Sequence, residues 1–142
     1  MSKPVNILFL CVANSARSQL AEGLAKQIFG KEAIIESAGS KPSGKVHPLA
    51  VMVLNEVGID ISQNKSKSIN DIPTSFYDNL DYVITLCAEE VCPVLPANAK
   101  RIHWPIQDPA MADEAHGKIA FVSARDFIKQ KLIELKSEIK KM

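Results

Sequence analysis

The chain has 142 residues, enough for one domain that buries a hydrophobic core. Hydrophobic residues make up 46% and charged residues 23% of the chain, which is typical of a globular protein. The formal net charge of +1 does not indicate the basic surface that nucleic-acid binding requires. No apolar run is long enough to cross a bilayer, and no signal-peptide pattern opens the chain. We therefore expect one domain over residues 1–142, a cytoplasmic location, a monomer, and neither a membrane nor a nucleic-acid partner.

The first half of the chain alternates between strand and helix patterns. The continuous apolar run 5–10 predicts a strand that is buried on both faces. Residues 18–29 carry apolar side chains at helical spacing, and Gly30 is a helix stop. A second strand is predicted over residues 33–37, and a second helix over residues 48–57.

The second half continues the same alternation after a polar stretch, residues 62–79, in which we expect a loop with one short helix. Residues 80–86 and 100–104 predict two further strands, the last of them ended by Pro105. Residues 120–139 predict a long amphipathic closing helix. Because such alternation implies parallel crossovers, we expect an α/β fold with a four-stranded, mainly parallel sheet and helices on both faces.

The most informative motif is the segment from Cys11 to Ser18, which lies between the first strand and the first helix. Backbone N–H groups that lead into a helix N-terminus can converge on a tetrahedral oxyanion. Arg17 adds a planar fork of charged donors, and the same positive field favours a thiolate at Cys11. The motif predicts an oxyanion cradle with a nucleophile at its base; the alternative is a small buried cysteine beside an ordinary helix arginine. The predicted lining residues are Val12, Ala13, Asn14, Ser15, Ala16, Arg17 and Ser18.

Within this segment the polar side chains suggest separate tasks. The amide of Asn14 suits a residue that satisfies backbone groups left unpaired by a tight turn. The hydroxyls of Ser15 and Ser18 can donate to an anion or to the Cys11 sulfur, and Ser18 is equally suited to an ordinary contact in the first helical turn.

Two further cysteines, Cys87 and Cys92, follow the predicted third strand. Three cysteines is an odd number, which argues against a static disulfide framework. On an intact helix their offset gives about 7.5 Å of rise, beyond the roughly 7 Å Cα limit of a disulfide, so a bond between them requires a loop or unwinding. We interpret them as a resolving dithiol facing the crevice of Cys11. The alternatives are two small apolar residues or a metal pair, for which no second ligand pair is present.

Asp108 follows the predicted fourth strand and is held by Pro109. A carboxyl group here can protonate a leaving oxygen, although a turn or helix-cap aspartate is the alternative. Loops at the carboxyl ends of parallel strands gather in one crevice, so we expect Asp108 to lie near Cys11 and Cys87. The histidines are dispersed and are interpreted as structural: His47, His103 and His116.

Taken together, these motifs resemble the low-molecular-weight protein tyrosine phosphatase superfamily, and within it the thioredoxin-coupled arsenate reductase branch. The spacing of Cys11, Arg17 and Ser18 is similar to the superfamily's phosphate loop, and Asp108 with Pro109 is similar to its general-acid loop. The pair Cys87 and Cys92 points to the reductase branch. Five further segments are similar to that branch: residues 19–22, 37–39, 46–48, 58–62 and 83–87.

The resemblance implies a three-thiol relay that acts on arsenate, with phosphate or sulfate as competing oxyanions. Cys11 attacks arsenate held by Arg17 while Asp108 protonates the departing oxygen. Cys87 then attacks the Cys11 sulfur, arsenite leaves, and Cys92 attacks Cys87 to give the disulfide that thioredoxin reduces. The four-residue gap between Cys87 and Cys92 is shorter than is usual in that branch, so glutaredoxin or a small thiol stays open as the reductant. No cofactor and no metal are implied.

The resemblance also bears on potassium, which that branch can bind through an asparagine, a glutamate, a serine and an aspartate. Asn14, Glu22 and Ser37 match, whereas Lys67 stands where the aspartate would be. We therefore predict that the Lys67 ammonium replaces the cation and that the protein has no potassium dependence.

Two other functions stay open at this point. A phosphomonoesterase would use Cys11, Arg17 and Asp108 alone and form a cysteinyl-phosphate intermediate. A thiol redox sensor would report oxidants by forming a disulfide and would turn over neither oxyanion.

Overall fold

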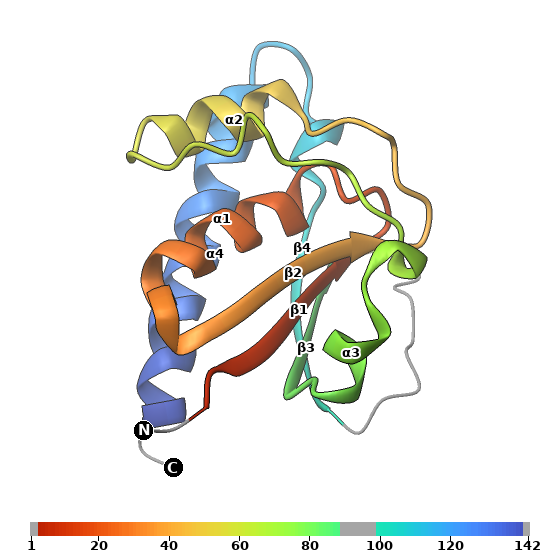
Figure 1. Ribbon diagram of the computed structural model, residues 1–142. Helices are drawn as coiled ribbons and strands as arrows, with labels where there is room; N and C mark the ends of the chain where they lie inside the picture. Colours follow the sequence, from red (N-terminus) through yellow and green to blue (C-terminus); the bar gives the residue numbers. More distant parts are fainter. Residues whose placement is uncertain (1–2, 89–98, 141–142) are drawn as a thin grey trace.

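Four parallel strands form the centre of the described structure, a computed structural model that describes residues 3–88 and 99–140 (Figure 1). The strands are β1 (Val5–Cys11), β2 (Ala33–Gly39), β3 (Tyr82–Cys87) and β4 (Lys100–Ile106). The α-helices are α1 (Arg17–Phe29), α2 (Pro48–Asn55), α3 (Thr74–Asp78) and α4 (Gly117–Lys140). Short 3-10 turns occur at η1 (Gly30–Glu32), η2 (Ile69–Asp71) and η3 (Pro109–Met111).

The strand order is β2-β1-β3-β4, and every neighbouring pair is parallel. β1 therefore lies inside the sheet, and its residues from Asn6 to Cys11 are all buried, as a continuous apolar run predicts. The predicted α/β class with a four-stranded parallel sheet is confirmed. The carboxyl ends of β1 and β3 lie side by side, since Leu10 is in register with Thr85.

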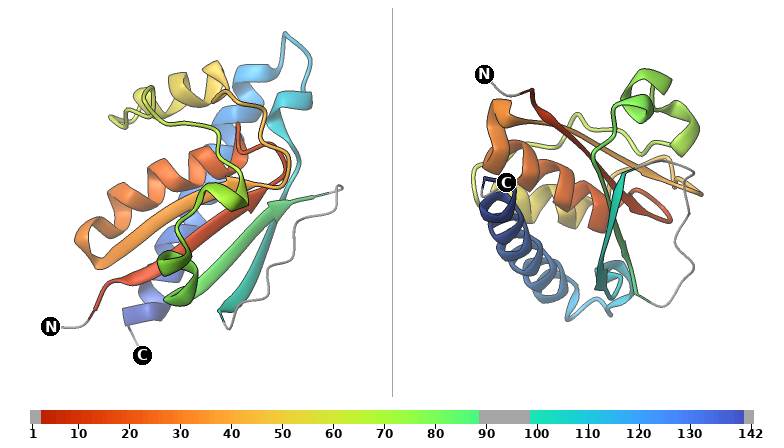
Figure 2. Two further views of the ribbon diagram at one scale, coloured as in Figure 1. Left: turned by 45° about the vertical axis from the view of Figure 1, so that its right-hand side comes forward. Right: turned by 90° about the horizontal axis from the view of Figure 1, so that it is seen from below.

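Helices cover the two faces of the sheet unequally (Figure 2). α1, α2 and α4 pack on one face and form the larger core, which includes Ile7 and Phe9 of β1. The short helix α3 and the turn η2 lie on the other face, over a smaller cluster that includes Leu8 and Leu10. We call these the three-helix face and the α3 face. None of the described helices combines the length and apolar character that a bilayer crossing needs.

The predicted and observed ends of β4 differ by two residues. The sequence predicts that Pro105 ends this strand at Trp104, but β4 continues through Pro105 to Ile106. That prediction is wrong because β4 is an edge strand, where a missing N–H costs no hydrogen bond to a neighbour. The register with β3 shifts between Thr85 and Cys87 at the same level. This irregular end carries the chain directly to Asp108.

Other elements also differ from their predicted bounds: β2 ends at Gly39 rather than at residue 37, α2 ends at Asn55 rather than at residue 57, and α4 begins at Gly117 rather than at residue 120. α1 ends where Gly30 adopts a positive φ of 55°, as predicted. The polar stretch 62–79 contains both η2 and α3, where one short helix was expected. Trp104 is buried in the larger core, with its ring 6.4 Å from that of Phe9.

Candidate active site

Cys11 is the last residue of β1 and lies at the base of the loop that leads into α1. Its Sγ is 2.8 Å from the Oγ of Ser18, in the first turn of that helix. The side-chain amide of Asn14 donates to the same Ser18 oxygen at 2.7 Å. Because this bond uses an acceptor position of the hydroxyl, the hydroxyl proton is free to point at sulfur. The Ser18 hydroxyl can therefore donate to the Cys11 sulfur, one of the two roles considered for it.

Backbone hydrogen bonds fix the direction of the peptide groups after Cys11. Residues 40–47, which we call the bracing loop, donate to three carbonyl oxygens: Lys41 to Val12 at 2.9 Å, Ser43 to Ala13 at 3.0 Å, and His47 to Ser15 at 3.0 Å. The C=O and N–H of a trans peptide point in opposite directions. The N–H groups that follow these carbonyls therefore point away from the brace, and residues 12–18 form the concave, donor-lined loop that an anion requires. We call this segment the oxyanion loop.

Asn14 holds the tightest turn of the oxyanion loop. Its φ is +48°, a left-handed conformation that asparagine tolerates better than most residues. Its Nδ2 donates to Ser18 and, at 3.0 Å, to Ser37 of β2. Its Oδ1 accepts from Gln19 Nε2 at 3.0 Å and from the backbone N–H of Lys67 at 2.7 Å. The side chain thus fixes the loop shape, as its residue type predicts.

Arg17 is buried at the start of α1 and reaches the ends of two strands. Its Nη1 donates to the carbonyl of Ile106 at 3.0 Å and to that of Leu86 at 3.5 Å. Its Nη2 lies 3.8 Å from Oδ2 of Asp108. The guanidinium therefore brings together the oxyanion loop, the end of β3 and the end of β4.

Asp108 uses its two carboxylate oxygens differently. Oδ1 accepts the N–H of Ala110 at 3.0 Å and caps η3, while Oδ2 faces Arg17. Asp108 therefore caps η3, which was the alternative role considered for it, and at the same time lies beside Arg17. The capping bond fixes the carboxyl group, and the second oxygen is directed at the oxyanion loop.

Cys87 is the last residue of β3 and is buried. Ile84 and Leu86 belong to the larger core and Val83 to the smaller one, so strand alternation places Cys87 on the α3 face. Cys11 contacts Ser18 of α1 and belongs to the three-helix face. Cys11 is a free thiol, whereas Cys87 is disulfide-bonded in this structure. The two cysteines end neighbouring strands and, by this alternation, face opposite sides of the sheet. Cys92 lies outside the described residues.

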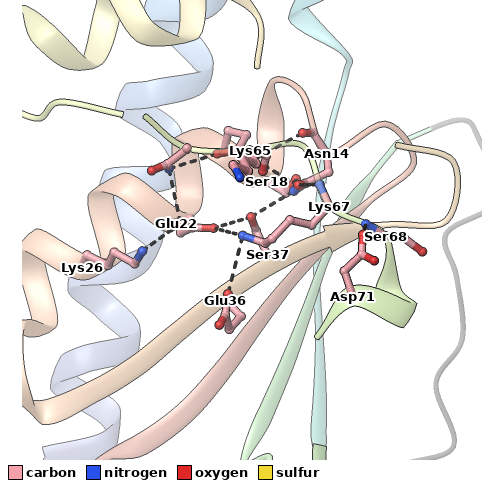
Figure 3. Close-up of polar contacts among 12 residues, drawn as sticks. Asn14, Ser18, Glu22, Lys26, Glu36, Ser37, Lys65, Lys67, Ser68 and Asp71 are labelled. Carbon is pink, nitrogen blue, oxygen red and sulfur yellow. Dashed lines mark hydrogen bonds and ion pairs between the residues drawn. The ribbon is translucent and has the colours of Figure 1, made fainter. Parts of the chain in front are cut away.

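Behind the oxyanion loop, the buried carboxylate of Glu22 is surrounded by donors (Figure 3). Its Oε1 accepts from Ser37 Oγ at 2.5 Å and lies 3.2 Å from Lys67 Nζ, while its Oε2 accepts from Lys26 Nζ at 2.9 Å. Burial raises the pKa of this carboxyl, but the hydrogen bonds from Ser37 and Lys26 and the charge of Lys67 outweigh burial, and the pKa lies below its ordinary value. Lys67 also lies 3.5 Å from Glu36.

Gly39 and the bracing loop are parts of the site that the sequence prediction did not assign. A Cβ on Gly39 would lie 2.3 Å from the Val12 carbonyl oxygen and 2.9 Å from the Asn14 nitrogen, so only glycine fits behind the loop. The signal available in the sequence was a glycine at a strand end, which often marks close backbone approach. Among the described residues, no three histidine, cysteine, aspartate or glutamate side chains form a metal-binding group.

The sequence model for the low molecular weight phosphotyrosine protein phosphatases matches residues 6–142, and the chain belongs to this family. Its curated relatives include the "Arsenate reductase" of Bacillus subtilis, 44% identical over 132 residues that cover 90% of this chain and 92% of that protein. The "Arsenate reductase" of Halalkalibacterium halodurans is 45% identical over 115 residues, 80% of this chain and 79% of that one.

Solved structures agree with these relatives. "An arsenate reductase in the phosphate binding state" has a TM-score of 0.78 and 32% identity, covering 95% of this chain and 98% of that one. The "thioredoxin-dependent arsenate reductase" of Corynebacterium glutamicum has a TM-score of 0.75 and 30% identity; the match covers 99% of this chain and 64% of that longer one. The predicted resemblance to the phosphatase superfamily and its arsenate reductase branch is confirmed.

Proposed function

We propose that this protein is a cytoplasmic arsenate reductase that converts arsenate to arsenite through Cys11, Cys87 and Cys92. The observation that carries the proposal is the Cys11 sulfur at the base of a loop whose carbonyl groups are held outward and whose last residues include the buried Arg17 and Ser18. Such a loop matches a tetrahedral oxyanion in shape and charge. The curated relatives named arsenate reductase support arsenate as the substrate.

In the first step the Cys11 thiolate attacks arsenic. A sulfur–arsenic bond forms and an arsenic–oxygen bond breaks, and Asp108 supplies the proton with which that oxygen leaves as water. The Oδ2 atom, 3.8 Å from Arg17, is the atom suited to this transfer. Loop N–H groups and Arg17 stabilise the charge that develops on the remaining oxygens.

In the second step Cys87 attacks the Cys11 sulfur. A disulfide forms between them, the electron pair of the sulfur–arsenic bond stays on arsenic, and arsenic(V) leaves as arsenite, arsenic(III). Strand alternation puts the two cysteines on opposite sides of the sheet, and Cys87 is disulfide-bonded in this structure. Cys87 must therefore be reduced and must turn about the end of β3 to reach Cys11. The step is therefore coupled to a local conformational change.

In the third step Cys92 attacks Cys87, which frees Cys11 and leaves a Cys87–Cys92 disulfide. An external thiol reductant restores the dithiol, and thioredoxin is the favoured donor because the similar enzyme of Corynebacterium glutamicum is a thioredoxin-dependent arsenate reductase. Glutaredoxin or a small thiol is the alternative donor. A relay that ends in thiol reduction requires a reducing compartment, which supports the cytoplasm as its location.

A phosphomonoesterase activity is the second candidate function. Arg17 lies 3.8 Å from Asp108 and belongs to the same loop as Cys11, so this set needs no contribution from Cys87, and the family match is to phosphatases. These three residues suffice for a cysteinyl-phosphate intermediate that water hydrolyses. We expect this activity as a slow side reaction of the same site.

Substitution of Cys87 by serine tests the relay. Cys87→Ser should abolish arsenate turnover and spare hydrolysis of an aryl phosphate, because only the second step needs this thiol. Cys11→Ser should remove both activities. Retention of arsenate reduction by Cys87→Ser, or loss of both activities in that variant, would contradict the relay, and a wild-type protein that turns over neither oxyanion would favour a redox sensor.

The order of attack can be read from the disulfides after a single turnover. Wild-type protein is mixed with one equivalent of arsenate without reductant, free thiols are alkylated, and the disulfides are mapped by mass spectrometry. We expect a Cys87–Cys92 bond and a free Cys11. A Cys11–Cys87 bond as the final product would contradict the third step.

A further inference from the structure

His47 lies where the bracing loop, α2 and α4 meet. Its Nδ1 accepts the N–H of Leu49 at 3.1 Å and so caps α2. Its backbone N–H donates to the Ser15 carbonyl of the oxyanion loop at 3.0 Å. Its ring packs against Phe121 of α4 with the centroids 4.7 Å apart. One residue thus joins a helix cap, a core contact and the oxyanion loop.

The cap requires a neutral imidazole. A nitrogen that accepts a hydrogen bond carries a lone pair, so the ring proton belongs on Nε2. Protonation at Nδ1 would place an N–H against the N–H of Leu49, and the cap would be lost. The new positive charge would also lie at the N-terminus of α2, where the helix dipole disfavours a cation.

We propose that His47 is a positioning residue for the oxyanion loop, and that its protonation weakens oxyanion binding. The backbone N–H of His47 holds the Ser15 carbonyl outward, which turns the N–H of Ala16 toward the oxyanion. When the cap is lost, the first turn of α2 loosens and this peptide is no longer fixed. The proposal rests on the proposed function only in requiring that the loop binds oxyanions.

Other charged groups occupy the elements packed around His47. On the α4 side, Lys118 and Arg125 both contact Glu56 of the α2 end, and His116 pairs with Asp113. Lys45 and Lys65 line a cavity that also contains Pro48, and Arg17 is directed at the strand ends. His116 is the only other histidine among these groups, which makes it the matched control.

Inorganic sulfate is the probe for the test, because its charge does not change between about pH 5.5 and pH 8, the range over which histidine titrates. The sulfate dissociation constant of the reduced protein is measured by calorimetry in the wild type, His47→Asn, His47→Ala and His116→Asn. Asparagine is a good helix cap that does not titrate, whereas alanine is a poor one.

At about pH 8 we expect His47→Asn to bind sulfate like the wild type, and His47→Ala to bind about fivefold more weakly, the loss equivalent to one helix cap. Between about pH 8 and pH 5.5 the wild type and His116→Asn should lose affinity by about fivefold more than His47→Asn does. The proposal is overturned when His47→Asn keeps the full pH dependence, or when His47→Ala binds sulfate as tightly as the wild type.

A general loss of stability is separated from positioning by Val53→Ala, a buried α2 position away from the cap. This variant should lower the melting temperature and leave sulfate affinity unchanged. Equal weakening of sulfate binding in Val53→Ala and His47→Ala at equal melting temperature would overturn the proposal. Intact sulfate binding without arsenate turnover would instead contradict the proposed function alone.

Discussion

Cys11 and Cys87 end neighbouring parallel strands, but their surroundings differ in kind. Around Cys11 the oxyanion loop is held from outside by the bracing loop and from inside by the Asn14 side chain. Around Cys87 the sheet is irregular, with a register shift and an edge strand that contains Pro105. A fixed loop suits oxyanion chemistry, which depends on donors that need no reorganisation. An irregular strand end suits a thiol that must turn to reach its target.

Arg17 is the physical link between these two regions. Its guanidinium belongs to the oxyanion loop, yet it donates to the carbonyl of Leu86, the residue directly before Cys87. It also donates to Ile106, which is in register with Cys87 on β4. If a bound oxyanion shifts the Arg17 guanidinium, the hydrogen bond from Arg17 to Leu86 at the end of β3 shifts with it.

The largest expected effect comes from Arg17→Lys. A lysine ammonium lacks the planar fork of five donors with which Arg17 can bind an oxyanion and both strand-end carbonyls at once, so kcat/KM should fall by about 100-fold or more for arsenate and for an aryl phosphate. Steady-state kinetics of both reactions check this. Arg125→Lys, on α4, is the matched control and should lose less than about twofold, because Arg125 contacts Val53 and Glu56 of the α2 end and not the oxyanion loop. A loss confined to one of the two substrates would show that Arg17 does not serve both regions.

Gly39→Ala should disturb only the Cys11 side of the comparison. The new Cβ meets the Val12 carbonyl, so the loop must shift, and we expect about tenfold weaker sulfate binding with about 1–3 kcal/mol lower unfolding free energy. Gly117→Ala is the control, because its Cβ meets only the flexible Leu49 side chain. If Cys87 of the reduced Gly39→Ala protein is alkylated at its wild-type rate, the strain at the oxyanion loop does not reach the end of β3. A changed rate would argue that the strain spreads through the sheet.

Lys67→Met tests the polar support behind the oxyanion loop. Because the folded-state pKa of Glu22 lies below its ordinary value of 4.5, Glu22 stabilises the fold above that pH, and this contribution is lost as the pH falls through the lowered pKa. Removing the ammonium should cost about 1–3 kcal/mol at pH 7 and much less at an acidic pH below the lowered pKa of Glu22, where the carboxyl is protonated in both variants. Urea unfolding at both pH values measures this. An equal cost at both would show that Lys67 acts through packing.

The sequence predicts the fold and the Cys11 region well because their signals are local. A buried strand, a short loop with Cys11 and Arg17, and an amphipathic helix follow one another directly. The bracing loop and Gly39 were not predicted, since their contacts with the oxyanion loop join distant parts of the chain. β4 continues through Pro105 because it lies at the edge of the sheet, and the strand order that places it there cannot be read from the local sequence.

The face of Cys87 was also beyond sequence reasoning, for a different physical reason. β1 and β3 are buried on both faces and read as continuous apolar runs, so no alternation of polar and apolar residues marks which side each residue occupies. Only the packing of Val83 against one core and of Leu86 against the other reveals it. For the proposed relay, Cys87 must therefore move to reach the crevice of Cys11.

The smallest expected effect is the response to potassium. Lys67 places its ammonium 3.2 Å from Glu22, and Asn14 and Glu22 both bond to Ser37, so the positive charge beside these groups is already supplied. Replacing sodium by potassium at equal ionic strength should therefore leave arsenate turnover and melting temperature unchanged in the wild type. A rise of either with potassium alone would mean that the ion still binds and that Lys67 does not replace it. The same comparison is made in Lys67→Met. A potassium response that appears only in this variant would show that the Lys67 ammonium makes the wild type insensitive to potassium.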